Sequence, residues 1–126
     1  GIPPEVMARY AAEMRQAVRS ELDRLRGEGA ENSHRWVNMS LAKAWLHRDD
    51  DKIPQGVKPQ LQHALGDSPK LAKLVAMREE LRQLWTRTNV SAEQLVSDLQ
   101  SWCKRAEDSG IAALQDFSFK LRAARA

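Results

Sequence analysis

The side chains best suited to chemistry in this chain are one cysteine and three histidines. Cys103 is the single thiol, in the segment SWCKRAEDSG. A catalytic thiol needs partial exposure, a cationic neighbourhood and usually a histidine within reach. Helical spacing instead places Cys103 on an apolar stripe, and His34, His47 and His63 fall in or beside three different expected loops. We therefore predict a buried, structural thiol and no catalytic residue.

Metal-binding and phosphate-binding motifs are not evident either. The chain has no HxxxH, HExxH, ExxH or CxxC pair, which are common spacings of metal ligands on helices and loops. The densest carboxylate cluster is RDDD at 48–51, but a calcium loop spaces its ligands at alternate positions around a glycine. The glycines are scattered at expected helix ends and loops and form no phosphate-binding glycine loop. We predict no metal-binding or cofactor-binding residue in this chain.

Helical signals recur along the whole sequence, and strand signals are nearly absent. Ser68 followed by Pro69 is a helix-start signal, and SAEQ from Ser91 reads as a capping box in which Gln94 reaches back to the cap residue. The predicted fold is all-α, with about six helices in a mostly antiparallel bundle and one domain over 1–126. The expected helices run from Pro3–Pro4 to the GEG at 27–29, from Asn32 or Ser33 to about His47, around Pro59 to Leu65, from 69 to about 87, from Ser91 past Cys103, and from Ile111 to about Leu121.

The second expected helix is apolar on two sides. Such a helix either lies at the centre of a bundle, which we favour here, or binds a partner with its second side. Of the four tryptophans, Trp45, Trp85 and Trp102 fall on stripes expected in the core, which leaves Trp36 as the exposed candidate. One side of the helix holds Val37, Leu41, Ala44 and Trp45; the other holds Met39, Ala42 and Leu46. The predicted interaction residues are Trp36, Met39 and Leu46 on the spare side, with Arg48 beside them.

The charge pattern gives little support to a polyanion-binding surface. The chain has 20 basic and 17 acidic residues, for a net charge of +3. The whole excess comes from Lys120, Arg122 and Arg125, which follow the last acidic residue, Asp116. Elsewhere Arg and Lys alternate with Glu and Asp, as on solvated helix faces, so nucleic acid is not an expected partner.

No apolar run is long enough to span a bilayer. Pro3 and Pro4 lead directly into an amphipathic pattern rather than a signal peptide. The piece itself is therefore expected to be soluble.

Several stretches resemble a known enzyme family. WCKRAEDSGIAALQDFSFKLR and the preceding LAKLVAMREELRQLWTRTNVSAEQLVSDLQ resemble the C-terminal end of bacterial membrane fatty-acid desaturases of the pseudomonad acyl-CoA Δ9 type. EVMARYAAEMRQAVRSELDRL and KAWLHRDDDKIP are similar to earlier parts of the same region. The resemblance covers nearly the whole chain, although it consists of a general similarity of residue pattern rather than of catalytic motifs.

The desaturase resemblance implies a membrane-embedded parent oxidoreductase that introduces a double bond into fatty acyl chains with a di-iron centre. Three isolated histidines cannot build that centre, so no catalytic or metal-binding residue is carried over onto this chain. The leading hypothesis is a non-catalytic tail domain on the cytoplasmic face of the inner membrane. It would serve docking, regulation or assembly, with the rest of the desaturase, an electron donor or a second copy as partner.

A second family shares part of this residue pattern. The progression LRQLW, then WCKRAEDSGI, is similar to the C-terminal region of ISL3-type transposases. This resemblance implies a nucleic-acid-associated helical domain. The DDE catalytic acids of such an enzyme would still be missing, because Asp49–Asp51 are contiguous in one loop. We keep this as the alternative hypothesis.

Overall fold

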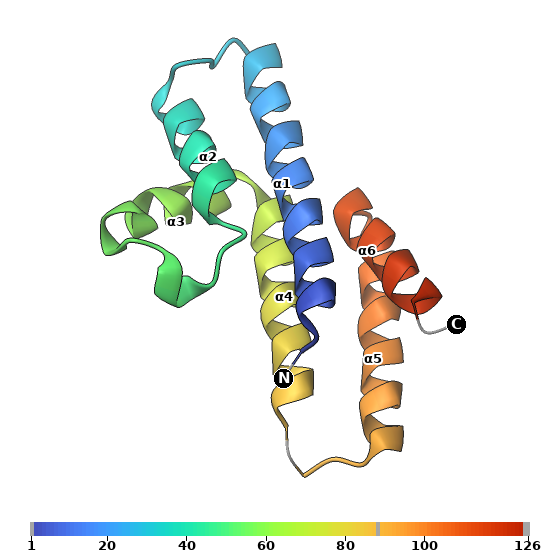
Figure 1. Ribbon diagram of the computed structural model, residues 1–126. Helices are drawn as coiled ribbons and strands as arrows, with labels where there is room; N and C mark the ends of the chain where they lie inside the picture. The colour runs from blue at the N-terminus through green and yellow to red at the C-terminus, as the bar shows by residue number, and fades with distance from the viewer. Residues whose placement is uncertain (1, 88, 125–126) are drawn as a thin grey trace. The chain divides into compact units, whose positions relative to one another are not determined.

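The computed structural model describes residues 2–87 and 89–124, and the all-α prediction is confirmed (Figure 1). Within the described residues there are six α-helices, two short 3₁₀ turns and no strand. The 3₁₀ turns, η1 (Asp50–Lys52) and η2 (Gln55–Val57), lie in the polar stretch where a plain loop was expected. The α-helices are α1 (Pro4–Gly27), α2 (His34–Trp45), α3 (Lys58–Asp67), α4 (Pro69–Thr86), α5 (Ala92–Glu107) and α6 (Ala112–Ala123).

Serine caps fix the starts of three helices. The Oγ atoms of Ser33, Ser68 and Ser91 each accept a hydrogen bond from the backbone N–H three residues later, at 3.0–3.2 Å. Each bond satisfies one of the amides that a helix start leaves without a partner. The reciprocal half of the predicted capping box is not made, because the side-chain amide of Gln94 donates to Asp98 Oδ1 at 2.9 Å.

A Schellman motif ends α1. The N–H of Ala30 donates to Leu25 O at 2.9 Å, and the N–H of Gly29 donates to Arg26 O at 3.0 Å. This pattern needs a left-handed residue just after the helix, and Gly29 has φ 76°. The glycine therefore satisfies the last carbonyls of α1 and turns the chain toward α2.

We expect Gly29→Ala to lower the free energy of unfolding by about 1 kcal/mol, because a side chain disfavours positive φ. No atom lies within 4 Å of where its Cβ would sit, so the cost comes from the backbone alone. Gly27→Ala is the matched control, since Gly27 is helical and equally uncrowded. Urea unfolding of both variants checks this, and equal stabilities would contradict it.

The contacts within the chain divide it into two units. Unit 1 combines Gly1–Glu13 with Lys73–Ala126, and unit 2 is Met14–Ala72. The division therefore falls within α1 and again within α4. The prediction of a single domain over 1–126 stays a prediction.

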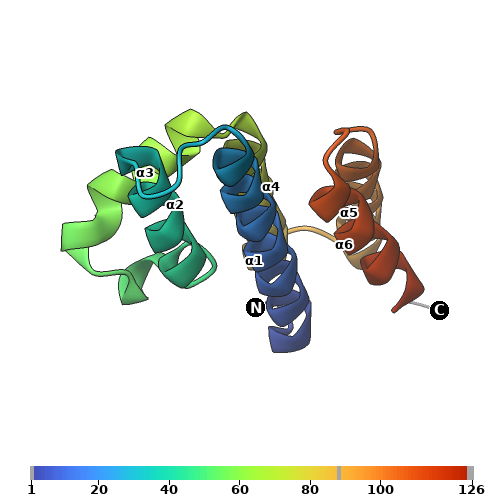
Figure 2. The same ribbon diagram turned by 90° about the horizontal axis from the view of Figure 1, so that it is seen from above.

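Unit 1 is built around an aromatic cluster. In this unit α4, α5 and α6 follow one another in alternating directions, with α5 packed on α6 (Figures 1 and 2). The Tyr10 ring lies 4.7 Å from Phe117 and 6.4 Å from Trp102, centroid to centroid. Burial raises the pKa of Tyr10 far above its ordinary value, and its hydroxyl donates to Leu74 O at 2.5 Å. The first turns of α1 are thus held to α4, 64 residues away in sequence.

Unit 2 contains the α1–α2 hairpin and α3, which packs against α2. Its most buried polar side chains form a pair between α1 and the start of α4. Ser68 Oγ donates a short hydrogen bond to the Glu21 carboxylate. Arg24 Nε donates to the same carboxylate at 2.7 Å. Both Glu21 and Ser68 are almost completely buried, so each satisfies the other.

Two tryptophan predictions need correction. Trp102 is completely buried, as expected, but Trp45 and Trp85 are only half-buried. Each lies at or next to the last residue of its helix, where fewer neighbours can cover an indole. The prediction that Cys103 is buried is confirmed, with 3% of its surface exposed.

Candidate nucleic-acid interface

The spare side of α2 is opposite to the one predicted. Met39 is 0% and Leu46 5% exposed, so they form the buried side of the helix together with Ala42. Val37, on the other side, is 51% exposed. Of the four predicted interaction residues, the structure leaves Trp36 half-buried and Arg48 exposed, so these two remain accessible. Helical spacing identified two apolar sides, but it could not indicate which one packs.

Each tryptophan of α2 carries an arginine on its ring. The guanidinium carbon of Arg26, on α1, lies 5.3 Å from the ring centroid of Trp36. Arg48 lies at the same distance from Trp45. At this distance a cation is attracted to the electron-rich face of an indole. The two pairs stand near the start and at the end of α2. Nine residues separate the tryptophans, so they lie on opposite flanks of the buried side of the helix.

A row of arginines continues this charge along α1. Arg15, Arg19 and Arg26 are separated by four and seven residues, which places them on one stripe of the helix. Lys43 follows Trp36 by seven residues and therefore shares the side of α2 that Arg26 contacts. Arg15, Arg19, Lys43 and Arg48 have no carboxylate partner in the part of the chain that the structure describes.

Several arginines of unit 2 are neutralised, and Arg26 is one of them, because it pairs with Asp23 at 3.3 Å and Glu31 at 3.4 Å. Arg35 pairs with Asp67 and with Glu28, each at 3.0 Å, and these two carboxylates raise the pKa of Arg35. Arg24 pairs with Glu21 at 2.7 Å and Glu28 at 3.0 Å. The end of the hairpin near the α1–α2 connection is therefore balanced, and the free positive charge lies along its length.

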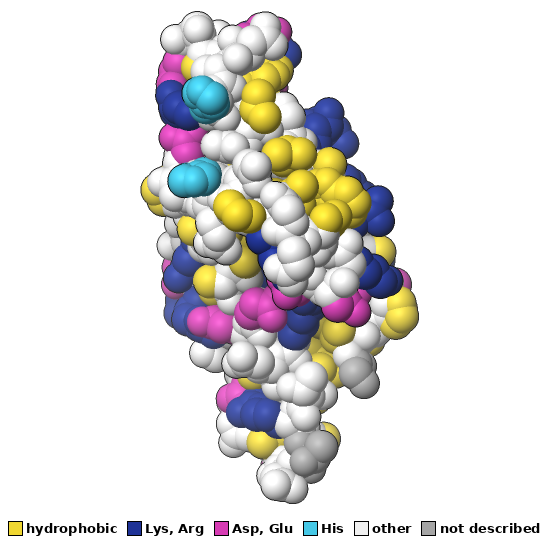
Figure 3. Space-filling view, turned by 90° about the vertical axis from the view of Figure 1, so that its left-hand side faces the viewer, with side chains coloured by type: hydrophobic (Ala, Val, Ile, Leu, Met, Phe, Trp, Pro, Cys, Tyr) yellow, Lys and Arg dark blue, Asp and Glu magenta, His cyan; other side chains and the backbone are white. Residues whose placement is uncertain are grey.

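We name this set of unit 2 residues the basic–aromatic face. Figure 3, which looks onto α2 and α3, shows apolar side chains gathered in a patch with Lys and Arg side chains along its border. On α2, Val37 is exposed and Leu41 half-buried. The basic–aromatic face comprises Arg15, Arg19, Arg26, Trp36, Lys43, Trp45 and Arg48.

The aspartates of unit 2 are not arranged as a metal site among the described residues. Asp49, Asp50 and Asp51 lie at η1, where Asp50 pairs with Lys58 at 3.1 Å. Across residues 2–87 and 89–124, no group of three or more His, Cys, Asp or Glu side chains is arranged to hold a metal ion. No helix among these residues is both long enough and apolar enough to cross a bilayer.

Cations without carboxylate partners and accessible aromatic rings are both features of proteins that bind nucleic acids. A family model described as transposase, the ISL3 type of DDE transposases, matches residues 6–126. The chain belongs to this family. Searches of curated proteins and of solved structures found no significant match.

The desaturase hypothesis is therefore wrong, and so are the lipid-metabolism and oxidoreductase functions and the inner-membrane location that it implies. The stretches that resemble a desaturase tail are amphipathic helices, whose Leu, Arg and Glu spacing is shared by many helical proteins. The transposase family also implies nucleic acid as a partner, against the prediction from charge. The prediction from charge missed this because it did not distinguish cations that pair with a carboxylate from cations without such a partner.

Proposed function

We propose that this chain is a DNA-contacting helical part of an ISL3-family transposase and that the basic–aromatic face makes the contact. The family match supports DNA as the partner. The observation that carries the proposal is the run of cations without carboxylate partners among the described residues: Arg15 and Arg19 on α1, then Lys43 and Arg48.

The chemistry of these side chains suits a duplex backbone. Guanidinium groups bind phosphate oxygens through paired N–H donors, and they do so without reading sequence. The half-buried indoles of Trp36 and Trp45 hold their arginines in place through ring contacts. We therefore expect binding that depends on salt and tolerates different sequences.

The role that we propose is binding rather than strand cleavage. Two-metal phosphoryl transfer needs carboxylates from separate elements that converge on one point. The three aspartates at η1 are consecutive in one turn, and they lack such convergence. The contact would hold DNA for a parent enzyme that performs transposition.

We expect the double variant Arg15→Gln/Arg19→Gln to weaken binding to a labelled duplex of mixed sequence. Each lost phosphate contact makes the slope of log K against log salt shallower by about 1, so the double variant loses about 2. Fluorescence anisotropy over about 50–200 mM salt measures that slope. Arg19 is exposed and Arg15 half-buried, and neither pairs with a carboxylate of a described residue, so the fold should persist.

The control is Lys104→Gln/Arg105→Gln on α5, which removes the same charge from residues that are already paired. Lys104 pairs with Asp108 at 3.2 Å, and Arg105 pairs with Glu80 at 2.6 Å. This variant should keep nearly the wild-type slope. Equal losses in the two double variants would contradict the basic–aromatic face, and the absence of binding at any salt would contradict the proposed function.

A further inference from the structure

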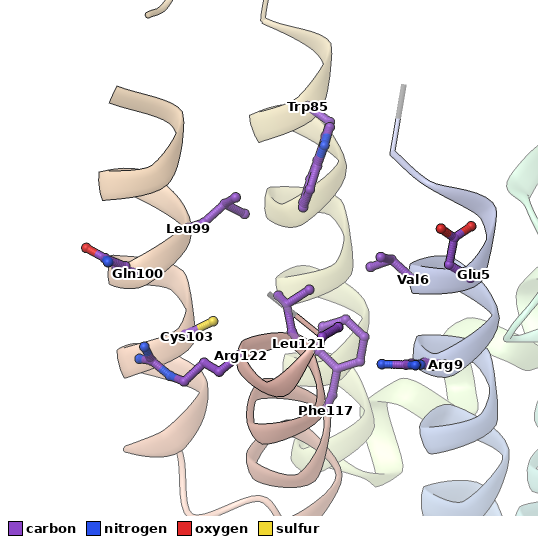
Figure 4. Close-up of a pocket in the computed structure, with 11 residues that line it drawn as sticks. Glu5, Val6, Arg9, Trp85, Leu99, Gln100, Cys103, Phe117, Leu121 and Arg122 are labelled. Atoms are coloured by element: carbon purple, nitrogen blue, oxygen red, sulfur yellow. The ribbon is translucent and has the colours of Figure 1, made fainter. Parts of the chain in front are cut away.

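Unit 1 holds a cavity that the DNA-contacting face does not use. Its volume is about 360 Å³, and helices α1, α4, α5 and α6 all contribute to its lining (Figure 4). Small-molecule sites in proteins begin at about 300 Å³ and are mostly apolar, with a few polar groups that orient the ligand. The cavity meets both conditions.

The walls of the cavity are apolar and partly aromatic. Trp85 enters from α4, Leu99 and Cys103 come from α5, and Phe117 and Leu121 come from α6 (Figure 4). Val6 completes the lining from α1. A surface of this kind takes up an aromatic or branched aliphatic group and offers few partners for the polar edges of a nucleobase.

Charged groups lie at the edge of the cavity. Arg9 extends from α1 toward Phe117 (Figure 4), and its Nη1 makes one long hydrogen bond, 3.4 Å, to Lys120 O. Arg9 has no carboxylate partner within residues 2–87 and 89–124, whereas Arg122 is held by Glu107 at 2.6 Å. Glu5, one turn before Arg9, also lies at the edge. Arg9 is thus the cation available to a ligand.

We propose that this cavity binds a small amphipathic anion, with its apolar body against Trp85 and Phe117 and its acidic group at Arg9. The proposal does not depend on DNA binding, because it concerns unit 1, whereas the basic–aromatic face belongs to unit 2. The acidic group would remain near water, where Arg9 can reach it, while the apolar body displaces water from the walls.

Two fluorescent probes separate the contributions of the apolar body and the charge. 1-Anilinonaphthalene-8-sulfonate carries one negative charge, and N-phenyl-1-naphthylamine has the same ring system without it. We expect both to bind the full chain saturably, one molecule per chain. Arg9→Gln should weaken the sulfonate about fivefold and leave the neutral probe unchanged. Glu5→Gln should strengthen the sulfonate and also leave the neutral probe unchanged.

Lys52→Gln, which removes an exposed cation of unit 2 outside the basic–aromatic face, is the control and should change neither affinity. Equal effects of Arg9→Gln on the two probes would overturn the assignment of the charge to Arg9. Because molten states also bind the sulfonate, the variants must retain cooperative thermal unfolding. Unsaturable binding by the cooperatively folded chain would overturn the site.

Cys103 provides an independent readout, since it is the only thiol in the chain and it lines the cavity. Either probe, when bound, should slow alkylation of Cys103 by N-ethylmaleimide in proportion to its occupancy. Leu99→Trp, which fills the cavity, should abolish binding of both probes. Unchanged alkylation at saturating probe would place the probe elsewhere and overturn the proposal.

Discussion

Trp102→Ala should lower the free energy of unfolding by about 3–5 kcal/mol, the range for removing a completely buried large aromatic side chain. Trp102 is 0% exposed, and its ring packs edge-on against Phe117 at 5.6 Å. Its indole N–H donates to Met77 O at 2.9 Å, so the variant also loses a buried hydrogen bond. Domains of this size are stable by about 5–15 kcal/mol, so the loss is a large fraction of the total.

Urea unfolding followed by far-ultraviolet circular dichroism measures this loss. Trp36→Ala serves as the control, because it removes an indole that is only half-buried. We expect a clearly smaller loss for the control. If the two variants lost the same stability, Trp102 would not be the centre of the unit 1 core.

Ser68→Ala should cost about 1–3 kcal/mol through two separate losses. The Ser68 hydroxyl caps α4 by accepting from Leu71 N–H at 3.2 Å, and it donates to the buried Glu21 carboxylate. Removing it leaves that carboxylate with one donor fewer inside unit 2. Ser91→Ala is the matched control, because Ser91 caps α5 at an exposed position without a buried carboxylate. A Ser68 variant no less stable than the Ser91 variant would contradict the role of Glu21.

The same pair predicts a dependence of stability on pH. Burial alone would raise the pKa of Glu21, but the hydrogen bonds from Ser68 and Arg24 outweigh it and lower the pKa. A carboxyl group with a lower pKa in the folded state stabilises the fold above its unfolded value, and this contribution is lost as the pH falls through the folded value. This contribution to stability should therefore be lost as the pH falls below the ordinary value of a glutamate, 4.5.

Glu21→Gln isolates this contribution from other carboxyl groups. The pKa of Glu107 is also lowered, by Arg122 and Ser118, so the wild type loses stability in acid for more than one reason. The decline measured by urea unfolding at several pH values should be shallower in Glu21→Gln than in the wild type. Parallel declines in the two proteins would show that Glu21 is not responsible.

The helices could be predicted from the sequence because their signals are local. Ser33, Ser68 and Ser91 mark starts through bonds to amides only three residues away, and Gly29 marks an end through its own backbone. The partners of each helix could not be predicted in this way. Nothing in the spacing around Tyr10 indicates that it packs on Trp102 and Phe117 rather than on the following hairpin.

The candidate site was only partly predictable for the same reason. Trp36 and Arg48 were identified because an indole and a guanidinium near a two-sided helix suggest a contact surface. Met39 and Leu46 were assigned to the wrong side, because both sides of α2 have similar apolar content and only tertiary packing distinguishes them. Likewise, the sequence does not distinguish Arg15 and Arg19 from other solvated arginines. Only the structure shows which arginines are neutralised by a carboxylate.

The discontinuity of unit 1 has a consequence for synthesis on the ribosome. Tyr10 leaves the exit tunnel roughly 5–20 s before Trp102 and Phe117 leave it, at about 5–20 residues per second. The continuous stretch of unit 2 emerges in the meantime. The first turns of α1 must therefore wait with an apolar stripe uncovered, as a natural binding segment for a chaperone until α6 is made.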